Sequence, residues 1–292
     1  MQNYLMAFLA GGLQSGMQSL NGELQAYIGL FGVSLVTHLI GGVLLTGYLL
    51  VRKERIRLGP MPWYLYSAGA LGLTLVAGSS LCVSRIGPAL TTCMSISGQL
   101  VFSTLMDHFG WMGVKRTPFR AKRLPGLAVV LIGVLEVNAQ AVKAGGRWDG
   151  GCLLLAFLLG GVNVLSKTVN FRAAGYLGTA NGTLINYLVA SPLSAVLMAL
   201  AGEAKGGVGA FGSAPLWLYL GGVCGVVALV LNVTSLKGLT LFQSAALLLM
   251  GQLAGAVVLD GVMYQDMSLG KLLGVLIVTT GVVLDKKTAL AQ

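Results

Sequence analysis

Charge is scarce in this chain, and negative charge is the scarcest. Only 10% of its 292 residues are charged, and aspartate and glutamate together number nine. Soluble domains carry about a quarter charged residues, so this composition excludes an ordinary soluble domain. Apolar residues make up 55% of the sequence. The chain is therefore predicted to be a polytopic membrane protein.

Motifs for catalysis, cofactors and metals are also missing. The sequence holds no nucleophile triad, zinc-peptidase motif or phosphate loop. Its four cysteines stand in or beside apolar runs without metal-ligand spacing: Cys82, Cys93, Cys152 and Cys224. Such cysteines behave as small apolar residues with free thiols. We expect no enzymatic activity, no cofactor and no metal.

Ten apolar runs are long enough to be transmembrane helices, which need about 20 residues each. Leu, Val and Gly dominate these runs, and they lack the alternation that a barrel strand shows over about ten residues. The predicted fold is an all-α polytopic membrane protein with ten spans, five in each half, over residues 3–20, 28–51, 62–83, 86–109, 124–141, 150–168, 176–201, 214–235, 239–263 and 270–284.

The sequence of the first half recurs in the second. Residues 7–39 align without a gap to 156–188, so that Gly11-Gly12 matches Gly160-Gly161, and Gly98-Gln99-Leu100 matches Gly251-Gln252-Leu253. Two halves with five spans each must run in opposite directions, which is typical of secondary transporters with a site at the repeat interface. The predicted units are residues 1–143, a connecting segment 144–151, and residues 152–292.

Basic residues are distributed as a topology signal. If ten helices alternate, fourteen of the nineteen lysines and arginines fall on one side, including the clusters at 52–57 and 115–123. The positive-inside rule then places both termini in the cytoplasm. The expected location is the cytoplasmic (inner) membrane, with no nucleic-acid partner.

One face of the first helix is polar in both halves. Gln14, Gln18 and Asn21 follow the spacing of a single helical face, and their repeat mates are Asn163, Lys167 and Asn170. Amide groups both donate and accept, so this face suits a polar or zwitterionic solute. Hydrogen bonding between helices explains Gln14 and Asn163 equally well. Helix capping is the favoured explanation for Asn21 and Asn170.

Other polar residues also recur within the spans. Gln99 and Gln252 each follow a glycine near the middle of a span, where they either contact a ligand or join helices. His38 and its mate Tyr187, and Asn186 beside it, are further candidates. A neutral, hydrogen-bonded His38 is the simpler interpretation, and the two halves cannot share a histidine mechanism.

Lys167 has Gln18 as its mate, which is the largest chemical difference between the halves. We expect it to snorkel to the cytoplasmic interface. The alternative is a fixed positive charge at the inner mouth of a cavity, which would favour anions. The first helix carries no mid-membrane carboxylate in either half, which makes cation/proton exchange a poor candidate.

Glycine positions and terminal acids are interpreted as structural. Gly126 and Gly133 recur as Gly274 and Gly281, and this stripe on the fifth and tenth helices is a candidate for the seam between the halves. Asp107 ends the fourth span and is predicted to have a structural role.

These residues resemble a known family. The Gln–Asn first helix, Gly98-Gln99-Leu100, the phrase Asp107-His108-Phe109-Gly110 and the basic loop after it resemble the YdcZ family of the drug/metabolite transporter superfamily. Family members occur as single five-helix chains or fused tandem copies, and this chain resembles the fused form throughout. In its second half Gln252 and Asp260 persist, but the basic loop is missing. The resemblance implies kinship with small multidrug exporters, whose membrane-embedded glutamate is absent here.

The predicted function is secondary-type transport of a small neutral, zwitterionic or amphiphilic solute through a cavity between inverted repeats. Two alternatives stay open: transport of a lipid-like amphiphile through a laterally open cavity, and a non-transporting scaffold or accessory protein. The expected partners are a small or lipid-like substrate and membrane lipids, and a monomer is sufficient. The predicted substrate-binding residues are Gln14, Gln18, His38, Gln99, Asn163, Lys167, Asn186, Tyr187 and Gln252.

Overall fold

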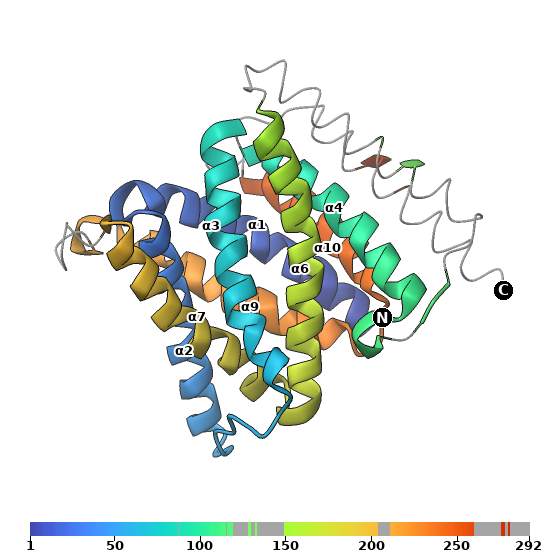
Figure 1. Ribbon diagram of the computed structural model, residues 1–292, viewed down its shortest axis with the longest axis horizontal. Coiled ribbons are helices and arrows are strands. Elements are labelled where there is room, and N and C mark those ends of the chain that lie inside the picture. Colours follow the sequence, from blue (N-terminus) through green and yellow to red (C-terminus); the bar gives the residue numbers. More distant parts are fainter. Residues whose placement is uncertain are drawn as a thin grey trace.

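In the part of the first half that the structure describes, the chain folds into four long helices. The computed structural model describes residues 1–86, 88–114, 116–118, 149–203 and 211–259, together with a few isolated positions. The helices of the first half are α1 (Gln2–Ile28), α2 (Leu30–Val51), α3 (Ala68–Ile86) and α4 (Pro88–Phe109), with the short 3-10 turns η1 (Trp63–Ser67) before α3 and η2 (Trp111–Gly113) after α4. Figure 1 shows α3 and α6 running side by side with α1 crossing them.

The second half repeats this order. Its elements are α6 (Gly150–Leu177), α7 (Thr179–Leu200), the turn η5 (Leu216–Tyr219), α9 (Leu220–Ser235) and α10 (Leu241–Leu259). No strand occurs in the described ranges. Among all described residues of both halves, five segments are long and apolar enough to cross a membrane: Leu30–Val51, Trp63–Cys82, Gly150–Leu177, Thr179–Leu200 and Leu216–Ser235. The all-helical membrane fold is thus confirmed. The number of ten spans stays a prediction, since 124–141 and 270–284 lie largely outside the described residues.

Corresponding helices of the two halves run in opposite directions. At one end of the bundle, Asn3 near the start of α1 lies against Gly238 before α10, and Arg172 near the end of α6 donates to the carbonyl of Met112 after α4. Leu236, Phe171 and Met112 share one apolar cluster there. Because α1 starts where α6 ends, the second half is inverted relative to the first.

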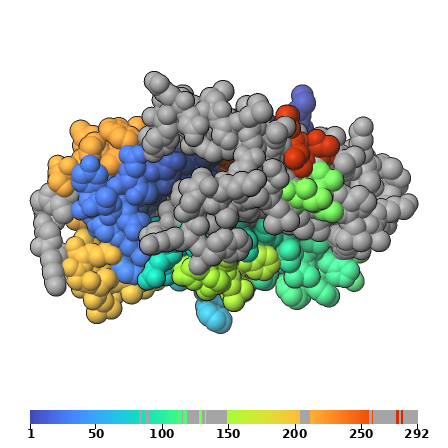
Figure 2. Space-filling view, turned by 90° about the horizontal axis from the view of Figure 1, so that it is seen from above, coloured from blue at the N-terminus to red at the C-terminus, as the bar shows by residue number. Residues whose placement is uncertain are grey.

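Arginines and lysines gather at this end, which we call the basic end. It also holds Arg55 and Arg57, because Asn181 at the start of α7 accepts a hydrogen bond from the Arg57 backbone N–H (2.9 Å) and donates to the Arg55 carbonyl (3.3 Å). At the opposite end, Glu203 accepts from the backbone N–H groups that begin α2, at 2.7 Å and 3.2 Å. Figure 2 shows the opposite end, where the blue α1–α2 corner lies between the gold end of α7 and the orange segment leading into α9.

Bare backbone allows α1 to cross α10 closely. A methyl group at Gly11 would overlap the carbonyl oxygen of Leu248, and one at Gly251 would overlap the carbonyl oxygen of Phe8. Helices in a membrane associate through van der Waals packing, which such small residues make possible. The first helix of the first half therefore packs on the fourth helix of the second half.

The crossing of α6 on α4 reproduces this packing with the repeat mates. A methyl group at Gly160 would overlap the carbonyl oxygen of Ser95, and one at Gly98 would overlap that of Phe157. The two sequence phrases that identify the repeat thus meet each other across the halves. The seam predicted for the glycines at 126, 133, 274 and 281 lies outside the described residues. Within the described residues, the halves join where α1 packs on α10 and α6 packs on α4.

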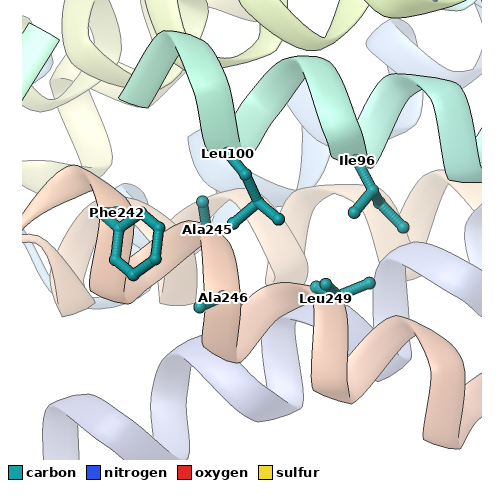
Figure 3. Close-up of a cluster of buried hydrophobic side chains, with 6 residues drawn as sticks. All are labelled: Ile96, Leu100, Phe242, Ala245, Ala246 and Leu249. Carbon is teal, nitrogen blue, oxygen red and sulfur yellow. The ribbon is translucent and has the colours of Figure 1, made fainter. Parts of the chain in front are cut away.

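A further contact between the halves is apolar and joins α4 to α10. Ile96 and Leu100 of α4 pack on α10 through a fully buried cluster (Figure 3), in which the α10 residues are Phe242, Ala245, Ala246 and Leu249. Asp107 at the end of α4 also accepts hydrogen bonds from the first two backbone N–H groups of α10, at 3.1 Å and 2.9 Å. Its carboxylate thereby satisfies donors that a helix start leaves open, which supports the predicted structural role.

Helices α1 and α6 are longer than their apolar runs predict. The sequence places their ends at residues 20 and 168, whereas the helices continue to Ile28 and Leu177. The extra turns carry polar residues such as Asn21 and Asn170, which are both buried. The side of these turns that carries the two asparagines packs inside the bundle, so their polarity is compatible with a helix. Their side chains therefore lie well inside helices, and the capping expectation for these two asparagines is wrong.

Candidate functional site

Two repeat mates meet at the centre of the bundle. His38 of α2 and Tyr187 of α7 have ring centroids 5.6 Å apart, with an interplanar angle of 55°. Both side chains are buried. Gly41 lets them approach, because a Cβ there would overlap the Tyr187 ring. Equivalent residues of two inverted halves can touch only near the axis that relates the halves, so this pair marks that axis.

Hydrogen bonds fix the orientation of the His38 ring. Nδ1 lies 2.7 Å from the carbonyl oxygen of Ser34, whose hydroxyl lies 2.9 Å from that of Ser194 on α7. A carbonyl oxygen only accepts, so Nδ1 must carry the proton. In the neutral ring, Nε2 is then an acceptor. The sequence analysis identified His38 but neither serine, because an isolated serine in an apolar run gives no distinguishing signal.

Asn186 lies beside His38 with an unsatisfied oxygen. Its side chain is buried, and its Oδ1 has no hydrogen-bond partner in the described part of the chain. A Cβ built on Gly72 of α3 would lie 3.1 Å from this Oδ1 and 3.5 Å from His38 Nε2. Two hydrogen-bond acceptors, Asn186 Oδ1 and His38 Nε2, therefore lie close to the backbone of Gly72, which has no side chain. Such a site could accept hydrogen bonds from a polar solute.

The equivalent position in the other half is paired. Thr37, the mate of Asn186, donates to Oδ1 of Asn21 at 3.5 Å. Asn170, the mate of Asn21, donates to the carbonyl of Ser166 at 2.8 Å, and its own Oδ1 has no partner among the residues that the structure describes. The halves thus share a buried polar position, and among the described residues the unpaired amide oxygens at this position, those of Asn170 and Asn186, belong to the second half. An unpaired buried acceptor is destabilising, so this asymmetry favours a functional role.

The two glutamines lie at the glycine crossings rather than beside His38. The backbone nitrogen of Gln99 lies against Gly160, and that of Gln252 against Gly11. Both side chains are buried, and Oε1 of Gln252 has no hydrogen-bond partner in the described ranges. The open acceptor keeps Gln252 as a candidate for ligand contact.

The polar residues on the shared face of α1 and α6 differ in burial. Gln14 and Asn163 are half-buried, and Gln18 is exposed. The structure therefore brings together His38, Tyr187 and Asn186, places Gln99 and Gln252 at the crossings, and distributes the α1 and α6 residues along the helices. Their joint role in substrate binding stays a prediction.

Lys167 does not snorkel. Its side chain is 3% exposed, and its Nζ is buried without a hydrogen-bond partner among the described residues. Helix α6 continues ten residues beyond it to Leu177, which is about 15 Å at the rise of an α-helix. A lysine side chain cannot span that distance, so the expectation of snorkelling is wrong.

A pocket opens at the basic end. Its volume is about 390 Å³, and its walls come from the last turns of α6 and the segment between α9 and α10: Phe171, Arg172, Ala174, Gly175, Tyr176 and Lys237. Two of these six residues are cations and two are aromatic. This composition suits the charged end of an anionic molecule.

Inverted helical halves with polar groups on their common axis define a class of protein, the membrane transporters built from inverted repeats. The family model described as "Putative inner membrane exporter, YdcZ" matches residues 3–135 and 151–284. The chain belongs to the YdcZ family, with one copy in each half.

Solved structures share the fold. Among 27 matching chains, one titled "Crystal structure of protein" has a TM-score of 0.70 and 16% sequence identity, with 97% of this chain and 95% of that chain covered. At this identity the likeness shows the fold alone. Among curated proteins, none matches the chain.

Proposed function

We propose that this protein is a secondary transporter that moves a small solute across the inner membrane by rocking one half against the other. The observation that carries the proposal is the site on the axis, where His38 Nε2 and Asn186 Oδ1 converge beside the bare backbone of Gly72. Secondary transporters built from inverted repeats bind substrate at such an interface near the midplane. By the positive-inside rule, the basic end faces the cytoplasm.

A scaffold or accessory role is the weaker candidate. A structural membrane protein is expected to pair its buried polar groups, because an unpaired group in a low-dielectric interior is costly. Here Asn186, Gln252 and Lys167 each keep a buried atom unpaired in the described part of the chain. These unpaired groups support a site that a ligand completes.

Water access to the centre tests this function. On a background without the four native cysteines, single cysteines replace Gln14, Gln99 or Gln252, and a membrane-impermeant thiol reagent is applied to each side of sealed vesicles. We expect labelling at these positions. The matched control is Ile96→Cys on α4, three residues before Gln99 and buried in the apolar cluster, which should stay unlabelled.

Absence of labelling at all three glutamine positions, in a folded protein, would contradict a solute cavity. A scaffold, or a lipid carrier whose site opens only to the bilayer, would then explain the molecule better.

A further inference from the structure

The unpaired charge of Lys167 requires an explanation beyond folding. Removing an ammonium group from water is strongly unfavourable unless another group compensates for it. Lys167 is buried and its Nζ has no hydrogen-bond partner among the described residues. The other half shows that the fold does not need this charge, because its repeat mate is the neutral Gln18.

The described part holds five carboxylates, and none of them hydrogen-bonds to the Lys167 Nζ. Glu23 on α1 has an interaction of its own, and the other four are engaged elsewhere. Asp107 caps α10, Asp149 caps α6, Glu203 caps α2, and Glu54 pairs with an arginine in its own loop. None of these four residues neutralises Lys167. The compensating negative charge is therefore expected from outside the described chain.

One face of α6 connects Lys167 to the pocket at the basic end. Lys167, Phe171 and Ala174 are spaced at i, i+4 and i+7, which places them on a single helical face. Phe171 and Ala174 line the pocket, whose cations are Arg172 and Lys237. Lys167 thus lies one turn deeper than Phe171, along the line that leads from the pocket into the bundle.

Phe171 lies on the α6 face between Lys167 and the pocket that contains Arg172 and Lys237. Its mate in the first half is Gly22, which is exposed, whereas Phe171 is half-buried and packs in the apolar cluster at the basic end. Along this face of α6, Phe171 therefore lies between Lys167 and the end of the helix, and it lines the pocket. The equivalent approach along α1 carries neither the aromatic residue nor the charge.

We infer that Lys167 is the binding site for the anionic group of the transported solute, reached from the basic end through the pocket of Arg172 and Lys237. The solute class is a small organic anion whose charged group is a carboxylate or phosphate. This inference rests on the proposed transport function and makes it more specific. The pocket volume of about 390 Å³ lies within the range of small-molecule sites, roughly 300–1,000 Å³.

Binding to the purified full-length protein in neutral detergent tests the inference. The probes are four compounds with the same six-carbon chain: hexanoate, hexyl phosphate, hexanamide and hexyltrimethylammonium. The variants are Lys167→Met and Lys167→Arg, with Lys53→Met as the matched control, since Lys53 is exposed in the loop after α2. The readout is the concentration of probe that gives half of the maximal increase in Tm.

We expect hexanoate or hexyl phosphate to stabilise the parent protein more strongly than the neutral and cationic probes. Lys167→Met should weaken this binding about tenfold or more, because a charge-assisted bond is lost. Lys167→Arg should retain most of it, and Lys53→Met should leave it unchanged. Without any probe, Lys167→Met should raise Tm, because it removes an unpaired buried charge. A lysine kept for packing would instead lower Tm when replaced.

The source of the anion is distinguished by adding phosphatidylglycerol to the detergent. If a lipid headgroup occupies the site, the lipid should compete with hexyl phosphate in the parent, and a soluble-solute site is overturned. Equal binding of anions to the parent and to Lys167→Met overturns the role of Lys167. That result leaves transport itself standing if cysteines at the central glutamines are still labelled, so the two proposals can fail separately.

Discussion

At the scale of single residues, a polar atom in this bundle is informative when it has no partner. His38 has a fixed ring orientation through Ser34, whereas Asn186 Oδ1 beside it is open. The Ser34 and Ser194 hydroxyls pair with each other and need no ligand. Sequence patterns identify a polar residue in an apolar run, but they do not show whether its polar atoms are paired or unpaired in the fold.

Gly72 supplies a residue-scale prediction for the central site. In Gly72→Ala the new methyl group would lie 3.1 Å from Asn186 Oδ1 and 3.5 Å from His38 Nε2, so it occupies the space where these acceptors converge. Binding of hexanamide, the probe whose amide N–H groups can donate to these acceptors, should weaken about tenfold, equivalent to roughly 1.4 kcal/mol.

The matched control is Gly47→Ala on α2, because a methyl group there meets no atom within 4 Å. It should leave probe binding unchanged. Equal binding by the two variants would mean that the solute does not approach Gly72.

At the scale of helices, glycine backbone decides how the halves meet. Gly11→Ala should lower the stability of the purified protein by about 1–3 kcal/mol, because its methyl group overlaps backbone that cannot rotate away. The measurement is thermal unfolding of the full chain in detergent.

Gly16→Ala is the control on the same helix, since a methyl group at Gly16 meets no atom within 4 Å. Its Tm should equal or slightly exceed that of the parent, because alanine favours a helix over glycine. A similar loss of stability in both variants would show that the crossing with α10 does not explain the effect.

The start of α6 is predicted to be sensitive to acid. Backbone N–H groups of Cys152 and Gly151 donate to the Asp149 carboxylate at 3.1 Å and 3.0 Å, and the bond from Cys152 contributes most to lowering the pKa of Asp149. A lowered pKa means that the cap contributes fully above the unfolded-state pKa of about 3.9. This contribution is lost as pH falls through the lower, folded-state value.

Asp149→Asn checks this direction, because asparagine also caps helices but does not titrate. The decrease in Tm below about pH 4 should be smaller in the variant than in the parent. Identical pH profiles would contradict a role for the cap in acid sensitivity.

At the scale of the whole molecule, α2 and α7 are tied at both ends. At the opposite end, Glu203, which follows α7, accepts hydrogen bonds from the start of α2. At the basic end, Asn181 at the start of α7 is hydrogen-bonded to the loop after α2. Rocking about the axis marked by His38 and Tyr187 requires these ties to open in turn. The two ends are therefore expected to alternate rather than open together.

A disulfide between α2 and α7 tests this alternation. The hydroxyl oxygens of Ser34 and Ser194 lie 2.9 Å apart, so cysteines at both positions lie within bridging reach. In the cysteine-free background with Gln99→Cys as reporter, oxidation should abolish labelling from the opposite end and preserve labelling from the basic end. The reference is Gln99→Cys alone under the same oxidant, and equal labelling of both proteins from the opposite end would contradict the rocking model.

The sequence by itself determined the membrane class, the two related halves and their family, because composition and repeated phrases are local properties that folding does not alter. It also identified the polar positions His38, Asn186, Tyr187 and Gln252. It underestimated the lengths of α1 and α6, since polar residues such as Asn21 resemble a loop until a neighbouring helix covers them.

Only the tertiary structure decided which helix covers each face. The exchange of α1 onto α10 and of α6 onto α4, the meeting of His38 with Tyr187, and the burial of Lys167 all depend on contacts between residues far apart in the chain. The free energy of a buried charge or amide is set by its neighbours. Some of those neighbours come from the other half of the molecule, as Tyr187 does for His38, so no local pattern specifies them.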